Sequence, residues 1–380
     1  MPKLRLKPRE SIHPMIRIVM VMGLFYLFLV SIKLMGTAFK MMASGEAESL
    51  FGEIASPFAG LAIGVLATVL VQSSSMTTSL TVAAVGSGAL PLPVAVFTIL
   101  GCNVGTTITN TLVAMAHMRQ DAEFKRAFAG ATMHDFFNLM ALLVFIPLEL
   151  ATGVLRTSAE ALSLRFYGSN AGAGAGFESP IKTAVKPAVD LLKSFFHEDL
   201  GFASKTTGFI LLIIALGFVA FSLIWITKTM RALIASRLEQ SLNRVLNERG
   251  LLAIIIGLLV TVSVQSSSIT TSLMIPLFGA GILKLENGFP VTLGANIGTT
   301  ITALLASLSS NQEGLTIAFV HLIFNVSATL LIYPVPAIRH IPIHLARGLA
   351  EKSAQNKLFG IGYVVGVFVL IPLLGYMLFD

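Results

Sequence analysis

The chain has 380 residues, of which 55% are hydrophobic and 12% are charged, and its net charge is +7. Soluble domains carry about 25% charged residues, so this composition excludes a soluble globular protein. The apolar runs are long and continuous, which excludes the roughly ten-residue alternating segments of a membrane β-barrel. Lys and Arg gather at the ends of apolar segments, as the positive-inside rule requires, so the basic charge does not indicate nucleic-acid binding.

In chain order, the apolar segments predict an all-α membrane protein. The first segment, 16–40, follows a basic N-terminus and is too long for the core of a signal peptide, so we interpret it as an uncleaved membrane helix. Two stretches, 54–88 and 250–282, are interrupted in the middle by polar residues. The other segments long enough to cross a bilayer are 91–116, 127–155, 207–230, 288–308, 315–336 and 357–379.

A ten-residue motif inside the first interrupted stretch occurs again inside the second. Val71–Leu80 returns 193 residues later as Val264–Leu273, and the copies differ only at Met76, which is replaced by Ile269. Matched landmarks in the same order indicate two homologous halves. The other matched landmarks are Gly64 with Gly257, Leu100–Thr109 with Leu293–Thr302, and the His-x-x-x-Asn pair His134 and Asn138 with His321 and Asn325.

The charges between the segments predict that the two halves are inverted in the membrane. The basic N-terminus and the loop with Arg119, Lys125 and Arg126 are placed inside, and the acidic segment 41–53 is placed outside. The arms of each interrupted stretch have about 12–17 residues, fewer than the roughly 20 needed to cross, which favours re-entrant hairpins. Repeat one then makes an odd number of crossings, so repeat two starts on the opposite face.

This topology divides the chain into four parts. Repeat one is expected at 1–155, with its first helix, the hairpin 54–88 and two helices, and an extracytoplasmic loop at 156–205. Inverted repeat two is expected at 206–336, with a helix, the hairpin 250–282 and two helices. A basic inner loop and the last transmembrane helix complete the chain at 337–380.

The two Gln-Ser-Ser-Ser clusters predict a transport site near the middle of the membrane. Polar groups there are costly unless they have partners. At a hairpin tip one arm ends with free carbonyls and the next begins with free N–H groups, and Ser74 or Ser75 is expected to cap the second arm. Capping alone does not explain three serines, a glutamine and two threonines in both copies. Hydroxyl and amide oxygens suit Na⁺, whereas N–H groups and hydroxyl protons suit an oxyanion.

The Asn-x-Gly-Thr-Thr motifs at 103–107 and 296–300 add further oxygen ligands. Their glycines permit an unwound turn or a close helix approach, so a small-residue packing face is the alternative interpretation. His134 and His321 are assigned to packing or helix-end hydrogen bonding, and Asp135 to a solvated or capping position near the inner surface. Cys102 is the single cysteine, which excludes an intramolecular disulfide.

These motifs resemble those of the type II sodium-phosphate cotransporter family. The likeness includes Asn110–Ala114 and Phe124–Asp135 and covers about 16–336. The resemblance implies Na⁺-driven uptake of inorganic phosphate by alternating access in a lipid bilayer, with Na⁺ as coupling ion and no cofactor or catalytic residue. The candidate substrate and sodium ligands are Gln72, Ser73, Ser74, Ser75, Thr77, Asn103, Thr106, Thr107, Gln265, Ser266, Ser267, Ser268, Thr270, Asn296, Thr299 and Thr300. Sodium itself is assigned to Gln72, Ser75, Gln265, Ser268, Thr299 and Thr300.

The chain departs from the animal members of that family in two places. Met118-Arg119-Gln120 stands where electrogenic members carry Ala-Gly-Asp, and Asp121 is out of register, so one implied sodium ligand has no counterpart. The region 156–205 is short and free of cysteine, unlike the large disulfide-bonded loop of animal members. We therefore expect a bacterial member in an inner membrane with a cytoplasmic N-terminus; the sequence leaves open whether it forms a homo-oligomer.

Three other functions compete with phosphate symport. A channel would share the polar midplane, but two hairpins that close on one site argue against an open path. An intramembrane serine hydrolase needs a base beside its nucleophile, and the nearest matched histidines are about 60 residues away in sequence. Sodium-coupled transport of another oxyanion stays open, since serine, threonine and N–H donors do not distinguish tetrahedral anions.

Overall fold

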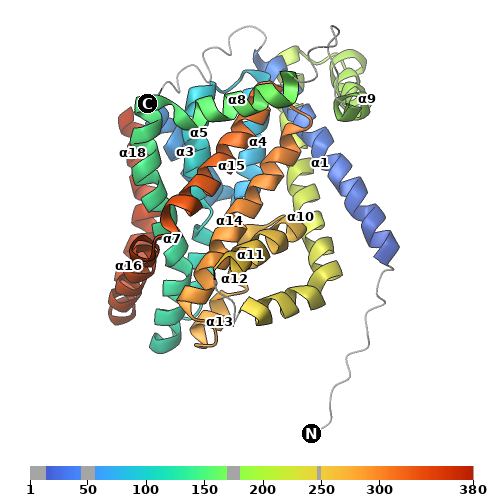
Figure 1. Cartoon of the computed structure of the whole chain (residues 1–380). Coiled ribbons are helices and arrows are strands. Elements are labelled where there is room, and N and C mark those ends of the chain that lie inside the picture. The colour runs from blue at the N-terminus through green and yellow to red at the C-terminus, as the bar shows by residue number, and fades with distance from the viewer. Residues whose placement is uncertain (1–13, 44–55, 169–179, 246–249, 380) are drawn as a thin grey trace.

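The computed structural model of the chain describes residues 14–43, 56–168, 180–245 and 250–379. Every regular element in those residues is a helix, which confirms the predicted all-α class (Figure 1). Seven helical stretches are long and apolar enough to cross a membrane. They match the seven predicted spans and are Met15–Met42, Leu92–Met115, Asp121–Thr152, Ser204–Arg231, Leu285–Ser307, Gln312–Ile332 and Lys357–Phe379.

Each interrupted stretch folds into two arms around its Gln-Ser-Ser-Ser cluster. In the first half, the arms are α3 (Pro57–Val71) and α4 (Ser74–Ser87). In the second half, the first arm is α11 (Leu251–Val264), and the second arm is divided into α12 (Ser267–Ser272) and α13 (Ile275–Gly279). We call these pairs hairpin one and hairpin two.

The helix that follows each hairpin carries the second repeated motif. In the first half it is broken into α5 (Leu92–Gly105) and α6 (Ile108–Met115) at Thr106-Thr107, as an unwound turn at the Asn-x-Gly-Thr-Thr motif predicts. In the second half the same motif lies inside one continuous helix, α14 (Leu285–Ser307). The next helices are α7 (Asp121–Thr152) and α15 (Gln312–Ile332).

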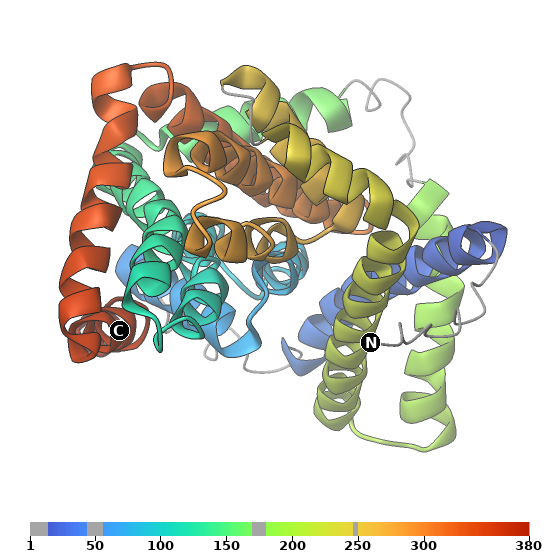
Figure 2. The same ribbon diagram turned by 90° about the horizontal axis from the view of Figure 1, so that it is seen from below.

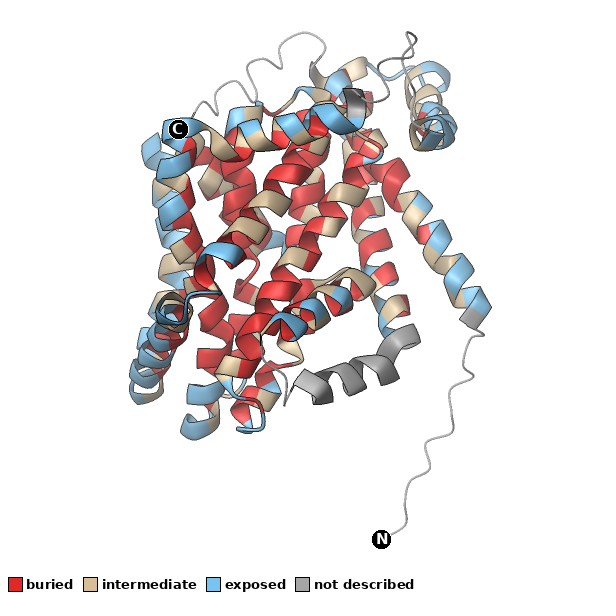
Figure 3. Cartoon of the chain, in the orientation of Figure 1, coloured by how far each residue is buried: buried red, intermediate tan, exposed pale blue. Residues whose placement is uncertain are grey.

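Three helices form a layer at one side of the molecule. They are α1 (Pro14–Ala43), α9 (Pro180–Ser194) and α10 (Ser204–Val245), and they contact one another. Figure 2 shows this layer beside the bundle that contains both hairpins. Buried residues follow the bundle helices through their length, whereas the outer faces of α1 and α10 are exposed (Figure 3).

Glycines set the distance between each hairpin and its neighbouring helix. A Cβ at Gly64 of α3 would collide with the Thr98 carbonyl of α5, and a Cβ at Gly257 of α11 would collide with the Val291 carbonyl of α14. Backbone-to-backbone contact of this kind needs small residues, as in other membrane helix pairs. The matched glycines therefore produce the same close packing, α3 on α5 and α11 on α14, in both halves.

The second arm of each hairpin packs against the other half of the chain. Helix α4 contacts α14 and α15, while α12 contacts α6 and α13 contacts α7. The first arms pack elsewhere: α3 contacts α5 and, outside both repeats, α18 (Ile371–Phe379), while α11 contacts α10 and α14. Because the arms are exchanged in this way, the two halves form one interlocked bundle and cannot separate as independent domains.

Two regions expected as loops contain helices. The region 156–205 includes most of α8 (Val154–Gly168), α9 and the π-helical turn η1 (Phe195–Asp199). The basic loop expected after residue 336 is instead α16 (Pro336–Gln355), which packs on α7 because its buried face carries Ile343, Ala346 and Ala350. The last span is α17 (Lys357–Val365), η2 (Gly366–Leu370) and α18 (Ile371–Phe379).

Some charges used to predict the topology lie outside the described residues. They are the basic N-terminal residues Lys3, Arg5, Lys7 and Arg9, the acidic residues Glu46, Glu48 and Glu53, and Arg249. The Ala-Gly run at 171–176 also lies outside them.

Candidate functional site

Both hairpin tips turn on a glutamine with a left-handed backbone. Gln72 has φ 56° and Gln265 has φ 57°, and they are the only non-glycine residues with positive φ in the described ranges. A left-handed residue with a side chain costs about 1–2 kcal/mol. Strain of this size, repeated at two matched positions, is typical of functional sites that the surrounding structure holds in place.

A serine directly after each glutamine caps the second arm. The Ser73 hydroxyl accepts a hydrogen bond from the Met76 N–H at 3.3 Å, and the Ser266 hydroxyl accepts one from the Ile269 N–H at 3.4 Å. The expectation that Ser74 or Ser75 caps the arm is therefore wrong by one or two positions. The left-handed turn at Gln72 puts Ser73 in the extended conformation that an N-cap needs, so the helix begins at Ser74.

The two glutamine side chains make the same pair of hydrogen bonds. Each amide nitrogen donates to a carbonyl in the last turn of the first arm, Val69 or Val262, at 2.6 Å. Each amide oxygen accepts from a threonine hydroxyl on the neighbouring helix. Thr109 donates to Gln72 at 3.3 Å, and Thr302 donates to Gln265 at 3.1 Å. The amide oxygens are thereby held at the tips with one lone pair still available to a cation.

The threonines and serines of the candidate site differ in whether their hydroxyl protons are already donated to a protein acceptor. The candidate threonines donate their hydroxyl protons to carbonyls three or four residues earlier, so their oxygens are left as acceptors suited to a cation. These bonds join Thr77 to Ser73, Thr106 to Cys102, Thr107 to Val104, Thr270 to Ser266, Thr299 to Ala295 and Thr300 to Ile297.

The four serines that begin the second arms keep their protons. Among the described residues, the hydroxyls of Ser74, Ser75, Ser267 and Ser268 donate to no protein acceptor, although Ser74, Ser75 and Ser267 are buried. None of these four hydroxyl oxygens is among the fully buried polar atoms that lack a partner in the described residues, so each can reach a ligand or water. These serines are therefore the groups best suited to donate to an oxyanion.

Helix α6 contacts both hairpins through two adjacent residues. Thr109 bonds Gln72 at the tip of hairpin one. Asn110, 2% exposed, accepts from Thr271 at 2.9 Å and from Ser272 at 3.0 Å, both on α12 of hairpin two. The tip of one hairpin and the second arm of the other thus lie at the two sides of one helix.

Four buried asparagines join the two halves at the matched motifs. Asn138 donates to the Asn103 carbonyl at 2.7 Å, and Asn296 donates to the side-chain oxygens of Asn138 at 3.1 Å and Asn325 at 2.6 Å. Each is at most 2% exposed. The amide N–H groups of Asn103 and Asn296, both in the predicted ligand set, are engaged with protein acceptors, Ile99 and the asparagines respectively.

Asp135 is not at a solvated surface, as the sequence suggested. It is fully buried on α7, and the Tyr363 hydroxyl of α17 donates to its Oδ2 at 3.1 Å. The matched helix α15 carries Leu322 at the corresponding place, so this buried carboxyl belongs to one half only. A buried acid within a membrane span is a candidate functional residue. Its position was predicted wrongly because helix α7 begins six residues earlier than expected.

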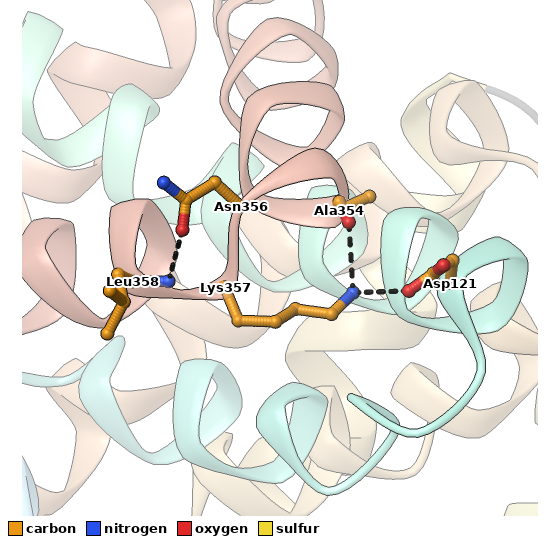
Figure 4. Close-up of polar contacts among 5 residues, drawn as sticks. All are labelled: Asp121, Ala354, Asn356, Lys357 and Leu358. Atoms are coloured by element: carbon orange, nitrogen blue, oxygen red, sulfur yellow. Dashed lines mark hydrogen bonds and ion pairs between the residues drawn. The ribbon is translucent and has the colours of Figure 1, made fainter.

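Asp121, next to the Met118-Arg119-Gln120 segment, lies in an exposed ion pair. Its carboxylate accepts from Lys357 at 2.6 Å, and Lys357 also donates to the Ala354 carbonyl at the corner between α16 and α17 (Figure 4). The Asp121 side chain is 76% exposed. Asn356 caps α17 at the same corner, so this contact fixes the start of α7 against the end of α16.

The fold and the tips define a multi-pass helical membrane protein with a duplicated polar site. The chain matches the model of the Na⁺/Pi-cotransporter family over residues 27–163 and 218–365, and it belongs to that family. The resemblance found in the repeated motifs is thereby confirmed.

Characterised relatives align over nearly the whole chain. The sodium-dependent phosphate transport protein 2A of Ovis aries is 33% identical, over 98% of this chain and 69% of the relative. The corresponding rat protein is 32% identical over the same shares. The human sodium-dependent phosphate transport protein 2B is 32% identical, over 94% of this chain and 64% of the relative. No solved structure matches the fold.

Three residues that hold the hairpins were not among the predicted site residues. Thr109 and Thr302 close the second repeated motif, so the repeat itself contained the signal. Asn110 is next in the chain but has no counterpart, since Ala303 stands at the matched position. Only the structure shows that Asn110 reaches across to the other hairpin.

Proposed function

We propose that the chain is a secondary active symporter that couples Na⁺ entry to the uptake of inorganic phosphate by alternating access. Membership of the Na⁺/Pi-cotransporter family and relatives named as sodium-dependent phosphate transport proteins support this function. The observation that carries it is the matched pair of tips, each with a held amide oxygen and two serine hydroxyls that still have protons to donate.

In this proposal, different groups at the tips bind the anion and the cations. The hydroxyls of Ser74, Ser75, Ser267 and Ser268 donate to phosphate oxygens. Sodium ions are coordinated by oxygens of Gln72, Ser75, Gln265, Ser268, Thr299 and Thr300, since these are hard neutral ligands. Bound sodium places positive charge beside the anion and raises its affinity, and each charge left uncompensated adds about 2.3 kcal/mol per 100 mV of membrane potential.

The proposed topology has two inverted repeats whose hairpins enter from opposite faces. Both first arms have fewer residues than a membrane span, 15 in α3 and 14 in α11, which supports re-entrant hairpins. In Figure 1, α13 of hairpin two lies at the lower end of the molecule and α4 of hairpin one lies in its upper half. We place the N-terminus in the cytoplasm of a bacterial cell and the protein in the inner membrane.

Radiolabelled phosphate uptake into proteoliposomes tests the proposal. We expect accumulation above the outside concentration when a sodium gradient points inward, and none when potassium replaces sodium. An imposed voltage then shows whether net charge moves with each cycle. Downhill phosphate flux that is independent of sodium would identify a channel and overturn the proposal.

Competition by other anions tests the identity of the substrate. Sulfate and arsenate are tetrahedral like phosphate. They are the necessary controls, because hydroxyl donors do not distinguish one tetrahedral anion from another. We expect unlabelled phosphate to suppress labelled phosphate uptake at lower concentration than sulfate does. Stronger suppression by sulfate would leave the proposed sodium coupling intact and identify sulfate as the preferred substrate.

A further inference from the structure

The buried carboxyl of Asp135 lies on α7, beside the break between α5 and α6. Asp135 is fully buried, and Thr107 and Thr111 lie next to its carboxyl. Thr107 is the N-cap of α6 and Thr111 is in the first turn of that helix. Because they are four residues apart, both threonines lie on the same face of α6, and α6 contacts α7.

The oxygens gathered at this place have no proton to share with one another. The Tyr363 hydroxyl donates to Asp135 Oδ2 at 3.1 Å, whereas Oδ1 is buried without a hydrogen-bond partner among the described residues. The hydroxyl proton of Thr107 is donated to the Val104 carbonyl at 2.9 Å, and that of Thr111 to the Thr107 carbonyl at 3.2 Å. A buried carboxylate is costly unless an opposite charge compensates it. A positive ion that binds to these oxygens would provide that compensation.

The break between α5 and α6 supplies further oxygens. In the described part of the chain, no backbone N–H donates to the carbonyls of Gly105 and Thr106, because the hydrogen-bond ladder of α5 ends there and that of α6 begins at Thr107. Carbonyls freed at a broken membrane helix bind sodium in other transporters. Carboxylate, hydroxyl and carbonyl oxygens are the ligands that a hard cation prefers.

The carboxyl and the break occur together in half one, and half two has neither. Leu322 stands at the place of Asp135, Leu304 stands at the place of Thr111, and α14 continues through the motif without a break. Holding a hairpin tip does not require the break, since Thr302 on the continuous helix bonds Gln265 as Thr109 bonds Gln72. The break therefore accompanies the carboxyl and not the tip.

We propose that Asp135 and the break between α5 and α6 form a sodium site that only half one contains. The inference rests on the proposed sodium-coupled transport and adds one coupling ion to those bound at the tips. Asp135 Oδ1 and the hydroxyl oxygens of Thr107 and Thr111 bind Na⁺, while Tyr363 orients the carboxyl through Oδ2. A proton on Oδ1 would neutralise the same carboxyl but would leave the freed carbonyls without a partner, which favours sodium.

Counting sodium ions tests the site. Asp135→Asn keeps the size of the side chain and an oxygen for Tyr363, and it removes the charge. We expect this variant to bind one radiolabelled sodium ion fewer per purified chain than the unaltered protein. In proteoliposomes it should also carry one sodium ion fewer per phosphate. Asp121→Asn, on the same helix but in an exposed ion pair, is the matched control and should leave both counts unchanged.

A second variant keeps the test decisive if Asp135→Asn does not fold. Thr111→Val preserves the shape of the side chain and removes one hydroxyl oxygen, so we expect sodium to bind several-fold more weakly while the melting temperature changes little. Leu304→Thr, at the matched position of α14, should leave sodium binding as it is in the unaltered protein.

Three outcomes would overturn the sodium site. One is an unchanged sodium count in a folded Asp135→Asn protein; if its uptake also loses its dependence on pH, the carboxyl holds a proton. Another is an equal loss in Asp121→Asn. The third is unchanged sodium affinity in Thr111→Val. Failure of the proposed function is distinguishable, because the unaltered protein would then show no sodium-driven phosphate uptake.

Discussion

The two hairpins share their tips and differ in their second arms. Gln72 and Gln265 have nearly the same backbone and the same two side-chain bonds. Yet α4 is continuous, whereas the matching arm breaks between α12 and α13. Pro276 stands where α4 has Ala83, and it lacks the N–H that would bond the Ser272 carbonyl.

The contacts of the arms differ as well. The arm that breaks is the one that Asn110 of α6 holds, while the matched Ala303 has no polar group that could bond to α4. Gln72 is exposed and Gln265 is half-buried. The duplicated residues therefore define the chemistry of the tips, and the unmatched residues define how each hairpin is supported. Of the two tips, tip one is therefore the more exposed at its glutamine.

Exchanging proline and alanine at the matched positions Ala83 and Pro276 should have the largest effect on stability. Ala83→Pro removes a hydrogen bond inside a buried helix and should cost about 3 kcal/mol or more of stability, lowering the melting temperature in detergent by many degrees. Pro276→Ala should leave the melting temperature unchanged or slightly higher. Ala83→Gly is the control, since it keeps the N–H and should cost about 1 kcal/mol. Equal losses from Ala83→Pro and Pro276→Ala would contradict the comparison.

Removing one serine from each tip should abolish most transport without unfolding the protein. Loss of a hydrogen bond to a charged ligand costs about 1.5–3 kcal/mol, so Ser74→Ala and Ser267→Ala should each lower phosphate kcat/KM by about 10- to 100-fold. Uptake in proteoliposomes measures this effect. Ser87→Ala, at the other end of α4, should retain normal uptake. Normal transport by both tip variants would remove the tips from the mechanism.

Breaking the unmatched contact should loosen hairpin two alone. Asn110→Ala leaves the Ser272 hydroxyl without its buried acceptor and should cost about 1–2 kcal/mol, seen as a lower melting temperature. Hydrogen exchange should then rise in α12 and stay constant in α4. A uniform rise in both hairpins would show that Asn110 supports the whole bundle and not one arm.

The smallest effect concerns the accessibility of the tips. Cys102, the only native cysteine, is buried and should give little background with a water-soluble thiol reagent. Gln72→Cys should react several-fold faster than Gln265→Cys because its side chain is exposed. Saturating sodium and phosphate should slow both reactions. Faster labelling at residue 265 would reverse the assignment of the accessible tip.

The elements of the fold that follow from apolar length were predictable from the sequence. The seven spans and the two short-armed interruptions were placed within a few residues, because length and hydropathy dominate helix formation in a membrane. Helix α16 was not predicted, since its mixed composition resembles a basic loop until its apolar face is seen against α7. Asp135 was misplaced because α7 begins six residues earlier than expected, and its partner Tyr363 comes from α17, more than 200 residues away in the chain.

The candidate site was predictable only where the repeat marked it. Gln72, Ser73 and their counterparts stand out because two copies preserve them. The exchange of the second arms, the asparagine bridge and the role of Asn110 depend on contacts between halves, which the sequence of either half does not contain.

Helix α6 is the place where one local change would affect both hairpins. Adjacent residues, Thr109 and Asn110, touch opposite hairpins, so neither hairpin can shift without changing the environment of the other. The environments of the two hairpins are thus connected within a single helical turn, with no intermediate residues. We expect substitutions at that turn to uncouple the two fluxes, so that sodium enters down its gradient without phosphate.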